Sequence, residues 1–421
     1  MSNQNDRGGG FLLWGISFVS SKLRNRKIRK YNKQSRGLEQ HTSITMDALF
    51  PVQLIHDNII ISGGTSNERL QFCEKILQNA YTQKQPVIVL TAGNSDLENT
   101  IVGNGFGIAA SRQRKIFDAF TFLELPDICQ VVIDTQRRKY DIKPNGRYIL
   151  QIAYDIILAH GLRPYFANFI KFTYHQIPDR IDECLANGII AQSKANELKS
   201  LLSMGQTEIA KIDAFFYDAK VQIGSISQTN PNTVGASSAL SAIWEEKIFL
   251  IDIGSSANIM ATEILINTLS IAESKGYNFS LLIDDISVAN NETLRNILCQ
   301  KSSSNKIIST QDAFALFDGE ERTFSTVVGL SEKTILLSHG SHISCEMWSK
   351  YIGEYDKIDT SQNSGGGWFQ SSRWGYVSKQ SQTETMKREQ KIKPEEINRL
   401  LQGQIFAYDN QNGSLIQANI I

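Results

Sequence analysis

The stretch from Phe279 to Ser287 reads FSLLIDDIS, an apolar and partly β-branched run that ends in two aspartates. Its length and composition suit a buried parallel strand, although periodicity alone does not separate such a strand from a buried helical segment. Residues 261–274, which precede it, carry apolar side chains at helical spacing, and residues 288–300, which follow it, are polar and then helix-like. The sequence therefore predicts a helix, a buried strand with an acidic end, and a second helix.

This arrangement is typical of the Walker B segment of nucleoside triphosphatases. The first acid of that segment holds Mg²⁺ and the second polarises the attacking water. These positions correspond to Asp284 as the metal ligand and Asp285 as a catalytic residue. The same pattern also fits a strand end whose acids cap the next helix or face solvent, so the rest of the chain has to decide.

The length and composition of the chain limit the class of protein to which it can belong. The chain has 421 residues, 41% of them hydrophobic and 20% charged, with a formal net charge of zero, which suits a globular protein of two or three domains. The five cysteines are widely spaced and form no CxxC pair, so a zinc site is not expected. Scattered cysteines fit a reducing cytoplasm, and we expect a cytoplasmic protein, with the inner face of the membrane as an alternative location.

Residues 1–47 form a basic N-terminal segment that we expect to be partly disordered. Residues 11–19 read FLLWGISFV, which is shorter than the roughly 20 apolar residues that span a bilayer. The polybasic stretch SKLRNRKIRKYNKQSR follows within a few residues. Three interpretations remain open: an interfacial membrane anchor, a helix docked on the protein, and a basic arm for nucleic acid.

The pattern of the remaining chain predicts an α/β domain with a mostly parallel sheet and an all-α insert. Residues 56–64 (HDNIIISGG) and 85–94 (QPVIVLTAGN) read as strands on either side of an amphipathic helix capped by Thr65 or Ser66, which makes a βαβ unit. We expect the following divisions: a first part of the α/β domain (48–147), an all-α inserted domain (148–226), a second part of the α/β domain (227–357), a flexible Ser/Gly/Gln-rich segment (358–385), and a C-terminal helix and strands that complete the domain (386–421).

A glycine turn follows the first of these strands, where a P-loop would lie. A P-loop requires Gly-x-x-x-x-Gly-Lys-Ser/Thr between a strand and a helix. Aligned from its first glycine, this chain has Glu68 at the second glycine, Arg69 at the lysine and Leu70 at the hydroxyl. A carboxylate repels phosphate, leucine cannot bind a metal, and arginine is not a neutral replacement for lysine.

In four features the chain resembles the TraG/TraD group of coupling ATPases of conjugation and type IV secretion, within the FtsK/HerA branch of RecA-like motors. The first two are LLIDDIS at 281–287 and KIISTQDAFALF at 306–317, which places Gln311 where the family has a glutamine near the nucleotide. The third is the strand and helix at 333–356, in which Ser349, Ile352 and Gly353 match a Ser-x-x-Leu/Ile-Gly pattern. The fourth is the closing segment MKREQKIKPEEINRLLQGQIFAY. The insert lies where the family carries its helical domain.

The resemblance implies a RecA-like P-loop NTPase fold with ATP and Mg²⁺ as cofactors. It assigns Asp284 to the metal, Asp285 and Gln311 to catalysis, and the nucleotide to the turn residues Gly63, Gly64, Thr65, Ser66, Asn67 and Arg69. Besides the altered turn, Asp285 replaces glutamate, and Lys301 stands where the family has an inter-subunit arginine. These departures predict a degenerate, non-hydrolysing relative that binds nucleotide weakly or not at all.

The leading hypothesis is a binding or scaffold component of DNA or protein transfer. Its expected partners are protein components of a transfer or secretion system, with DNA, a membrane surface and a homo-hexamer as further possibilities. One alternative is an active DNA-translocating ATPase with an altered P-loop, and another is an unrelated structural or regulatory α/β protein. The aromatic residues Trp368, Phe369 and Trp374 beside Arg373 are typical of base stacking, of a partner hot spot, or of a loop folded back on the domain.

Overall fold

The computed structural model describes residues 23–51, 57–227, 237–255, 258–287, 291–364 and 380–420. The apolar stretch 11–19 and the aromatic cluster Trp368, Phe369 and Trp374 lie outside the described residues. Among the described helices, none is both long and apolar enough to cross a lipid bilayer.

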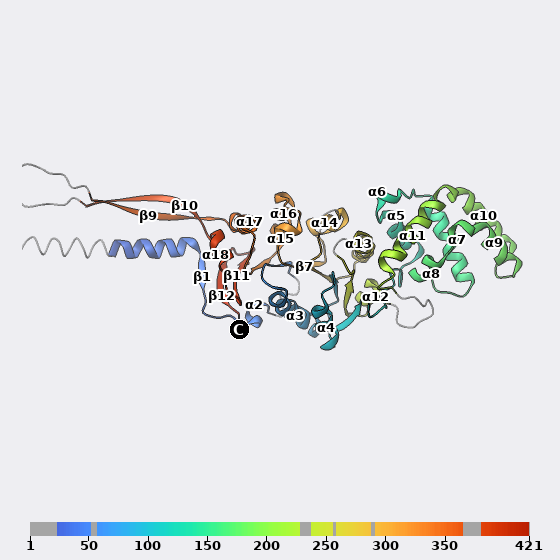
Figure 1. Cartoon of the computed structure of the whole chain (residues 1–421), viewed down its shortest axis with the longest axis horizontal. Coiled ribbons are helices and arrows are strands. Elements are labelled where there is room, and N and C mark those ends of the chain that lie inside the picture. The colour runs from blue at the N-terminus through green and yellow to red at the C-terminus, as the bar shows by residue number, and fades with distance from the viewer. Residues whose placement is uncertain are drawn as a thin grey trace, which may run out of the picture.

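A ten-stranded sheet forms the centre of the molecule (Figure 1). In spatial order its strands are β1 (Leu38–Gln40), β12 (Leu415–Asn419), β11 (Gln404–Asp409), β8 (Lys333–Leu336), β2 (Ile59–Ser62), β7 (Asn305–Thr310), β6 (Ser280–Asp284), β3 (Val87–Thr91), β5 (Ile248–Asp252) and β4 (Gly107–Ala110). From β8 to β4 all neighbours pair in parallel, and β11 runs antiparallel to both β8 and β12. The predicted α/β fold with a mostly parallel sheet is confirmed.

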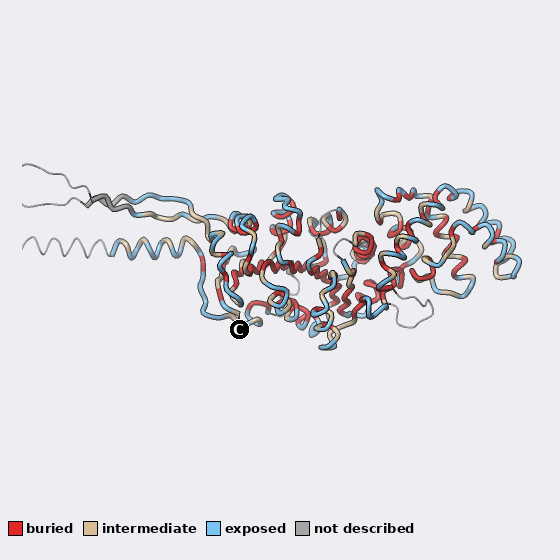
Figure 2. The backbone as a smooth tube through the Cα atoms, viewed as in Figure 1, coloured by how far each residue is buried: buried red, intermediate tan, exposed pale blue. Residues whose placement is uncertain are grey.

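Helices cover both faces of this sheet, so the central strands are buried on both sides (Figure 2). Ile59 and Ile61 of β2 pack in one hydrophobic core, while Ile60 packs in the other, as the two-residue period of a strand requires. The first core contains side chains of α2 (Met46–Leu49), α3 (Ser66–Thr82) and α4 (Ser95–Gly103). The second contains side chains of α12 (Ala239–Trp244), α13 (Ile259–Ser274), α14 (Glu292–Cys299), α15 (Ala313–Leu316), α16 (Glu321–Leu330), α17 (His342–Ile352) and α18 (Pro394–Asn398).

A helical unit lies at one end of the molecule (Figure 1). Its helices are α5 (Leu125–Asp134), α6 (Arg137–Tyr140), α7 (Gly146–Ala159), α8 (Phe166–Lys171), α9 (Ile177–Ala186), α10 (Gln192–Gly205) and α11 (Ile209–Ile223), with short 3₁₀ turns at Tyr174–Gln176 and Gln206–Glu208. The buried carboxylate of Asp118 accepts hydrogen bonds from the amides of Phe120, Thr121, Phe166 and Ala167. This carboxylate therefore joins the segment that leaves β4 to the start of α8.

A long arm projects from the opposite end of the core (Figure 1). It consists of the antiparallel strands β9 (Glu354–Ser364) and β10 (Gln380–Gln390), beside the helix formed by residues 23–36. At both ends of the range 358–385, where the sequence predicts a flexible segment, the described residues form this paired ribbon. Cross-strand ion pairs such as Lys357 with Glu389 and contacts with the adjacent helix stabilise the ribbon.

Candidate functional site

The predicted site residues meet at the carboxyl edge of the parallel strands. β2 leads into Gly63, β6 ends at Asp284, and β7 ends one residue before Gln311. Since β2 and β6 flank β7 in the sheet, the turn after β2 and the two aspartates lie close together. The carboxyl edge of a parallel α/β sheet is where such folds bind ligands.

The turn after β2 is short and tightly enclosed. Gly63 and Gly64 have positive φ angles of 98° and 63°, and helix α3 begins at Ser66. A Cβ atom on Gly63 would lie 2.7 Å from the His339 ring and 2.8 Å from the Leu337 carbonyl oxygen. The amides of Gly63 and Gly64 already donate to the carbonyl oxygens of Thr310 and Ser338. This backbone therefore packs against β7 and β8, where a P-loop would wrap around phosphates.

The N-terminus of α3 is capped by its own side chains. Thr65 is the N-cap, and its hydroxyl accepts from the Glu68 amide. In return the Glu68 carboxylate accepts from the amide of Thr65 at 2.9 Å and from that of Gly403 at 3.2 Å. Burial opposes ionisation of Glu68, but these hydrogen bonds hold its pKa below the ordinary value. An internal carboxylate thus occupies the helix end that would attract a phosphate.

The side chain of Arg69 is buried and binds groups of the protein itself. Its guanidinium donates to the carbonyl oxygens of Gly63 at 3.2 Å and Gly64 at 3.0 Å, and it forms an ion pair with the Asp285 carboxylate. The residue is only 3% exposed. The other Asp285 oxygen accepts from the backbone amide of Gln311 at 2.8 Å. The candidate catalytic residues Asp285 and Gln311 are therefore brought together, but through a network that ties α3, β6 and β7 to one another.

The buried carboxylate of Asp284 links β6 to three other parts of the chain by hydrogen bonds. One of its carboxylate oxygens accepts from the Ser309 hydroxyl at 3.0 Å, and the other accepts from the Asn94 amide at 2.8 Å and the Thr91 hydroxyl at 3.2 Å. Burial raises the pKa of Asp284 above its ordinary value, and the neighbouring charge of Asp285 acts in the same direction. Three of the roughly four acceptor positions of this carboxylate are therefore used inside the protein.

These contacts test whether the residues suit ATP and Mg²⁺. A P-loop site needs free amides, a cation that reaches the outer phosphates and a hydroxyl for the metal. Here the Thr65 and Glu68 amides are paired and Arg69 is neutralised by Asp285. The residues present do not fit a P-loop nucleotide complex.

A cavity of about 300 Å³ opens beside this network. Its lining includes Ser66 and Asn94, together with the carboxylates of Asp96, Asp284 and Asp285. None of its lining residues is a lysine or arginine, so its charge repels phosphate. Asn67, which the resemblance assigned to the nucleotide, does not line this cavity.

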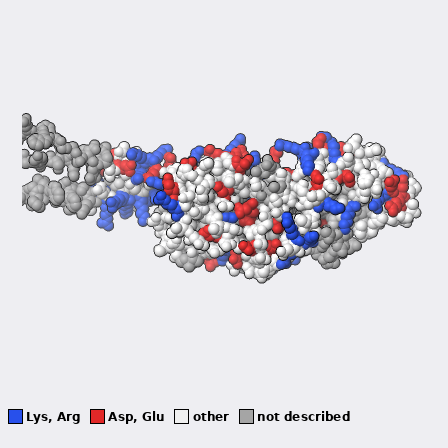
Figure 3. Space-filling view, in the orientation of Figure 1, with Lys and Arg blue, Asp and Glu red and all other residues white. Residues whose placement is uncertain are grey.

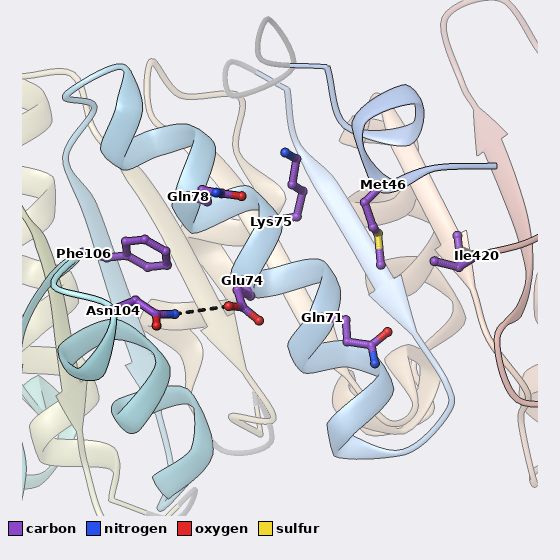
Figure 4. Close-up of a pocket in the computed structure, with 8 residues that line it drawn as sticks. All are labelled: Met46, Gln71, Glu74, Lys75, Gln78, Asn104, Phe106 and Ile420. Atoms are coloured by element: carbon purple, nitrogen blue, oxygen red, sulfur yellow. Dashed lines mark hydrogen bonds between the residues drawn. The ribbon is translucent and has the colours of Figure 1, made fainter.

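A larger cavity of about 550 Å³ lies elsewhere, along the outer side of α3 (Figure 4). It is lined by polar side chains of α3, by Asn104 and Phe106 from the turn before β4, and by Met46 and Ile420. Asn104 donates to the Glu74 carboxylate at 3.2 Å across its wall. None of the predicted site residues lines this cavity, and its groups suggest no catalytic arrangement.

Sequence reasoning missed one buried group next to the turn, His339. Its Nδ1 lies 2.8 Å from the Leu337 carbonyl oxygen, which can only accept, and its Nε2 lies 2.9 Å from the Ser62 hydroxyl. The Leu337 contact places a hydrogen on Nδ1, and when the ring is neutral the Ser62 hydroxyl donates to Nε2. Burial lowers the pKa of His339. The sequence LSHG after β8 contains this histidine, but only the pairing of β8 with β2 places it against Gly63.

A scan against protein-family models finds no match, and a comparison with curated protein sequences finds none either. Comparison with solved structures does find matches. The unbound form of the bacterial conjugative coupling protein TrwBdeltaN70 is similar with a TM-score of 0.55 and 12% identity. TrwB in complex with the non-hydrolysable GTP analogue GDPNP gives 0.56 and 11%, and TrwB with ADP and Mg²⁺ gives 0.51 and 12%. In each case 90% of this chain and 88% of the other chain are covered.

The chain has the fold of the conjugative coupling protein TrwB. The resemblance predicted from the sequence is confirmed at the level of fold, and with it the RecA-like architecture. TrwB has been solved with nucleotides bound. At the carboxyl edge of its own sheet, this chain carries the hydrogen-bonded network of Glu68, Arg69 and Asp285.

Proposed function

We propose that this chain is a non-hydrolysing relative of the conjugative coupling ATPases and acts as a binding or scaffold component in DNA or protein transfer. The observation that carries the proposal is that the turn after β2 and the start of α3 bind groups of the protein itself where a nucleotide would bind. Glu68 takes the anion position at the start of α3, and Asp285 neutralises the cation that would meet a phosphate.

The chemistry of phosphoryl transfer supports this conclusion. Catalysis of that reaction depends on positioned cations and on a free carboxylate or amide that orients the attacking water. In this chain Asp285 accepts from Arg69 and from the Gln311 amide, and Asp284 accepts from three side chains. The motor fold is retained while the groups that would act on nucleotide hold its strands and helix together.

The proposed partners are protein components of a transfer or secretion system, and DNA is a further proposed ligand. A motor fold without hydrolysis can still present the surfaces through which such components assemble. In cells that carry out the transfer, removing the whole chain should then lower the transfer frequency strongly. Gln311→Ala removes the exposed side chain of a candidate catalytic residue and keeps the backbone amide that donates to Asp285, so it should leave the transfer frequency near the wild-type value.

The direct test is equilibrium binding of a fluorescent ATP analogue, with and without Mg²⁺, to the wild type and to Asp284→Asn. Asp96→Asn is the matched control, because Asp96 lines the same cavity but is exposed. We expect no Mg²⁺-dependent binding at millimolar nucleotide in any of the three proteins, and no phosphate release with or without DNA. Mg²⁺-dependent binding that Asp284→Asn abolishes and Asp96→Asn keeps would instead support the active, DNA-translocating ATPase.

A further inference from the structure

The helix of residues 23–36 is strongly basic and lies apart from the acidic groups of the core. It contains seven Lys and Arg residues and no Asp or Glu: Arg24, Arg26, Lys27, Arg29, Lys30, Lys33 and Arg36. In the space-filling view, blue side chains gather on this helix beneath the ribbon (Figure 3). The arm therefore presents a concentrated positive charge on a chain whose formal net charge is zero.

One side of this helix is fixed to the outer edge of β9. The Asn32 amide donates to the Ile358 carbonyl at 3.0 Å, and its oxygen accepts from the Ile358 amide at 2.9 Å. In this way it pairs the backbone of β9 as another strand would. The Ser35 hydroxyl donates to the Asp356 carbonyl at 2.8 Å, and one guanidinium nitrogen of Arg36, Nη2, donates to both carboxylate oxygens of Glu396. These contacts fix the rotation of the helix about its axis.

This rotation places most of the cations of the helix on the side that faces away from β9. At 100° per residue, positions 26, 30 and 33 lie roughly opposite positions 28, 32 and 35. Five cations are exposed and have no ion pair among the described residues: Arg26, Lys27, Arg29, Lys30 and Lys33. The two cations nearer the ribbon, Arg24 and Arg36, pair with Glu384 and Glu396. These five residues without an ion pair form what we call the cationic face of the helix.

We infer that this cationic face binds the anionic head groups of a lipid surface. A face of four to eight Lys and Arg on a helix is typical of contact with anionic lipid. The sequence favours lipid over nucleic acid, because the apolar run FLLWGISFV ends four residues before Leu23, and Leu23 itself is 56% exposed. An apolar stretch next to a basic helix suits the boundary between head groups and acyl chains, whereas a polyphosphate backbone offers it no partner.

The inference does not depend on the nucleotide site. Each Lys or Arg held near an anionic membrane contributes about fivefold in affinity. Replacing two of them should therefore lower affinity by about 25-fold. Binding of the cationic face to lipid should also weaken steeply as the salt concentration is raised, since exposed charges are screened beyond about 10 Å at 0.1 M salt.

The test is co-sedimentation of the full-length chain with vesicles of phosphatidylcholine alone or of phosphatidylcholine with phosphatidylserine. The variant is Lys30→Gln with Lys33→Gln. The matched control is Lys115→Gln with Lys301→Gln, two exposed lysines of the core that have no ion pair among the described residues. Thermal unfolding of all three proteins checks that each one is folded.

We expect the wild type and the control to bind phosphatidylserine vesicles in a salt-dependent way, and the variant to bind about 25-fold more weakly. Equal binding to both kinds of vesicle, an equal loss in the control, or the absence of vesicle binding would overturn the inference. The same proteins are tested on a DNA duplex and on a single strand. A loss of DNA binding in the variant without any vesicle binding would assign the cationic face to nucleic acid.

Discussion

The guanidinium of Arg69 forms an ion pair with the carboxylate of Asp285, although 216 residues separate them in the chain. Arg69 comes from the first turn of α3 and Asp285 from the residue after β6. In a working P-loop enzyme, the groups at these two positions would act on the bound nucleotide. Here they neutralise each other, and this pairing is the basis of the proposed loss of hydrolysis.

Arg69→Met should destabilise the fold. The substitution removes two hydrogen bonds to the turn carbonyls and leaves Asp285 unpaired. Because the Asp285 side chain is 42% exposed, water compensates part of the loss, and we expect a decrease of about 2 kcal/mol in the free energy of unfolding. Urea unfolding measures it. Arg322→Met at an exposed position should change stability by less than about 0.5 kcal/mol, and an equal effect of both substitutions would contradict the prediction.

Two glycines with positive φ angles should respond differently to alanine. Both substitutions strain the backbone at about 1 kcal/mol, since φ is 98° at Gly63 and 89° at Gly93. Only at Gly63 does the new Cβ meet neighbours, at 2.7 Å from His339, whereas nothing lies within 4 Å of it at Gly93. Gly63→Ala should therefore cost about 3 kcal/mol or more and Gly93→Ala about 1 kcal/mol. Similar melting temperatures for the two variants would show that the turn is not enclosed as described.

Asp284→Asn should reduce the change in the free energy of unfolding between neutral pH and pH 4. Burial raises the pKa of folded Asp284 above the value of 3.8 that applies to the unfolded chain. Between these two values the folded state binds more protons, so the free energy of unfolding falls as pH rises through the folded pKa. Asparagine cannot ionise, so the free energy of unfolding of Asp284→Asn, taken relative to that of the wild type, should decrease from neutral pH toward pH 4. Urea unfolding over this pH range measures the trend, and Asp96→Asn at the exposed position should not reproduce it.

His339 should make the fold sensitive to mild acid in the opposite sense. Burial lowers its folded pKa below the unfolded value of 6.5, and the charge of Arg69 acts in the same direction. The stability due to the neutral ring is then complete above pH 6.5 and is lost as pH falls toward the folded pKa. His339→Gln should reduce this loss, whereas His342→Gln on the exposed start of α17 should keep it. A wild-type stability that stays constant from pH 7 to pH 5 would contradict the prediction.

Restoring the motif residues alone should not restore nucleotide binding. The variant Glu68→Gly, Arg69→Lys, Leu70→Ser recreates the letters of a P-loop. Of the eight positions from Gly63 to Leu70, however, the five from Ser66 onward already lie in helix α3. The turn is too short to surround phosphates whatever its residues. We expect no gain in affinity for the fluorescent ATP analogue, and Mg²⁺-dependent binding by the triple variant would show that side chains alone had closed the site.

Local sequence patterns determined much of the fold. Apolar runs with acidic or glycine ends predicted β2, β3 and β6, and helical spacing predicted α3 and α13. The segment around Gly107 shows no such pattern, although the structure has α4 followed by β4 there. A Cβ at Gly107 would lie 2.1 Å from the Ile248 carbonyl oxygen, so this glycine marks a close approach of two strands that no local pattern reveals.

The sequence by itself determined that the P-loop residues are replaced, because each substitution is visible in the order of the residues. Only the tertiary structure decided what the replacements do. Glu68 reaches the amide of Gly403, Arg69 reaches Asp285, and Asn32 reaches Ile358, across separations of 335, 216 and 326 residues. Contacts of this kind depend on which strands become neighbours, and strand order follows from burying both faces of one sheet rather than from any short stretch of the chain.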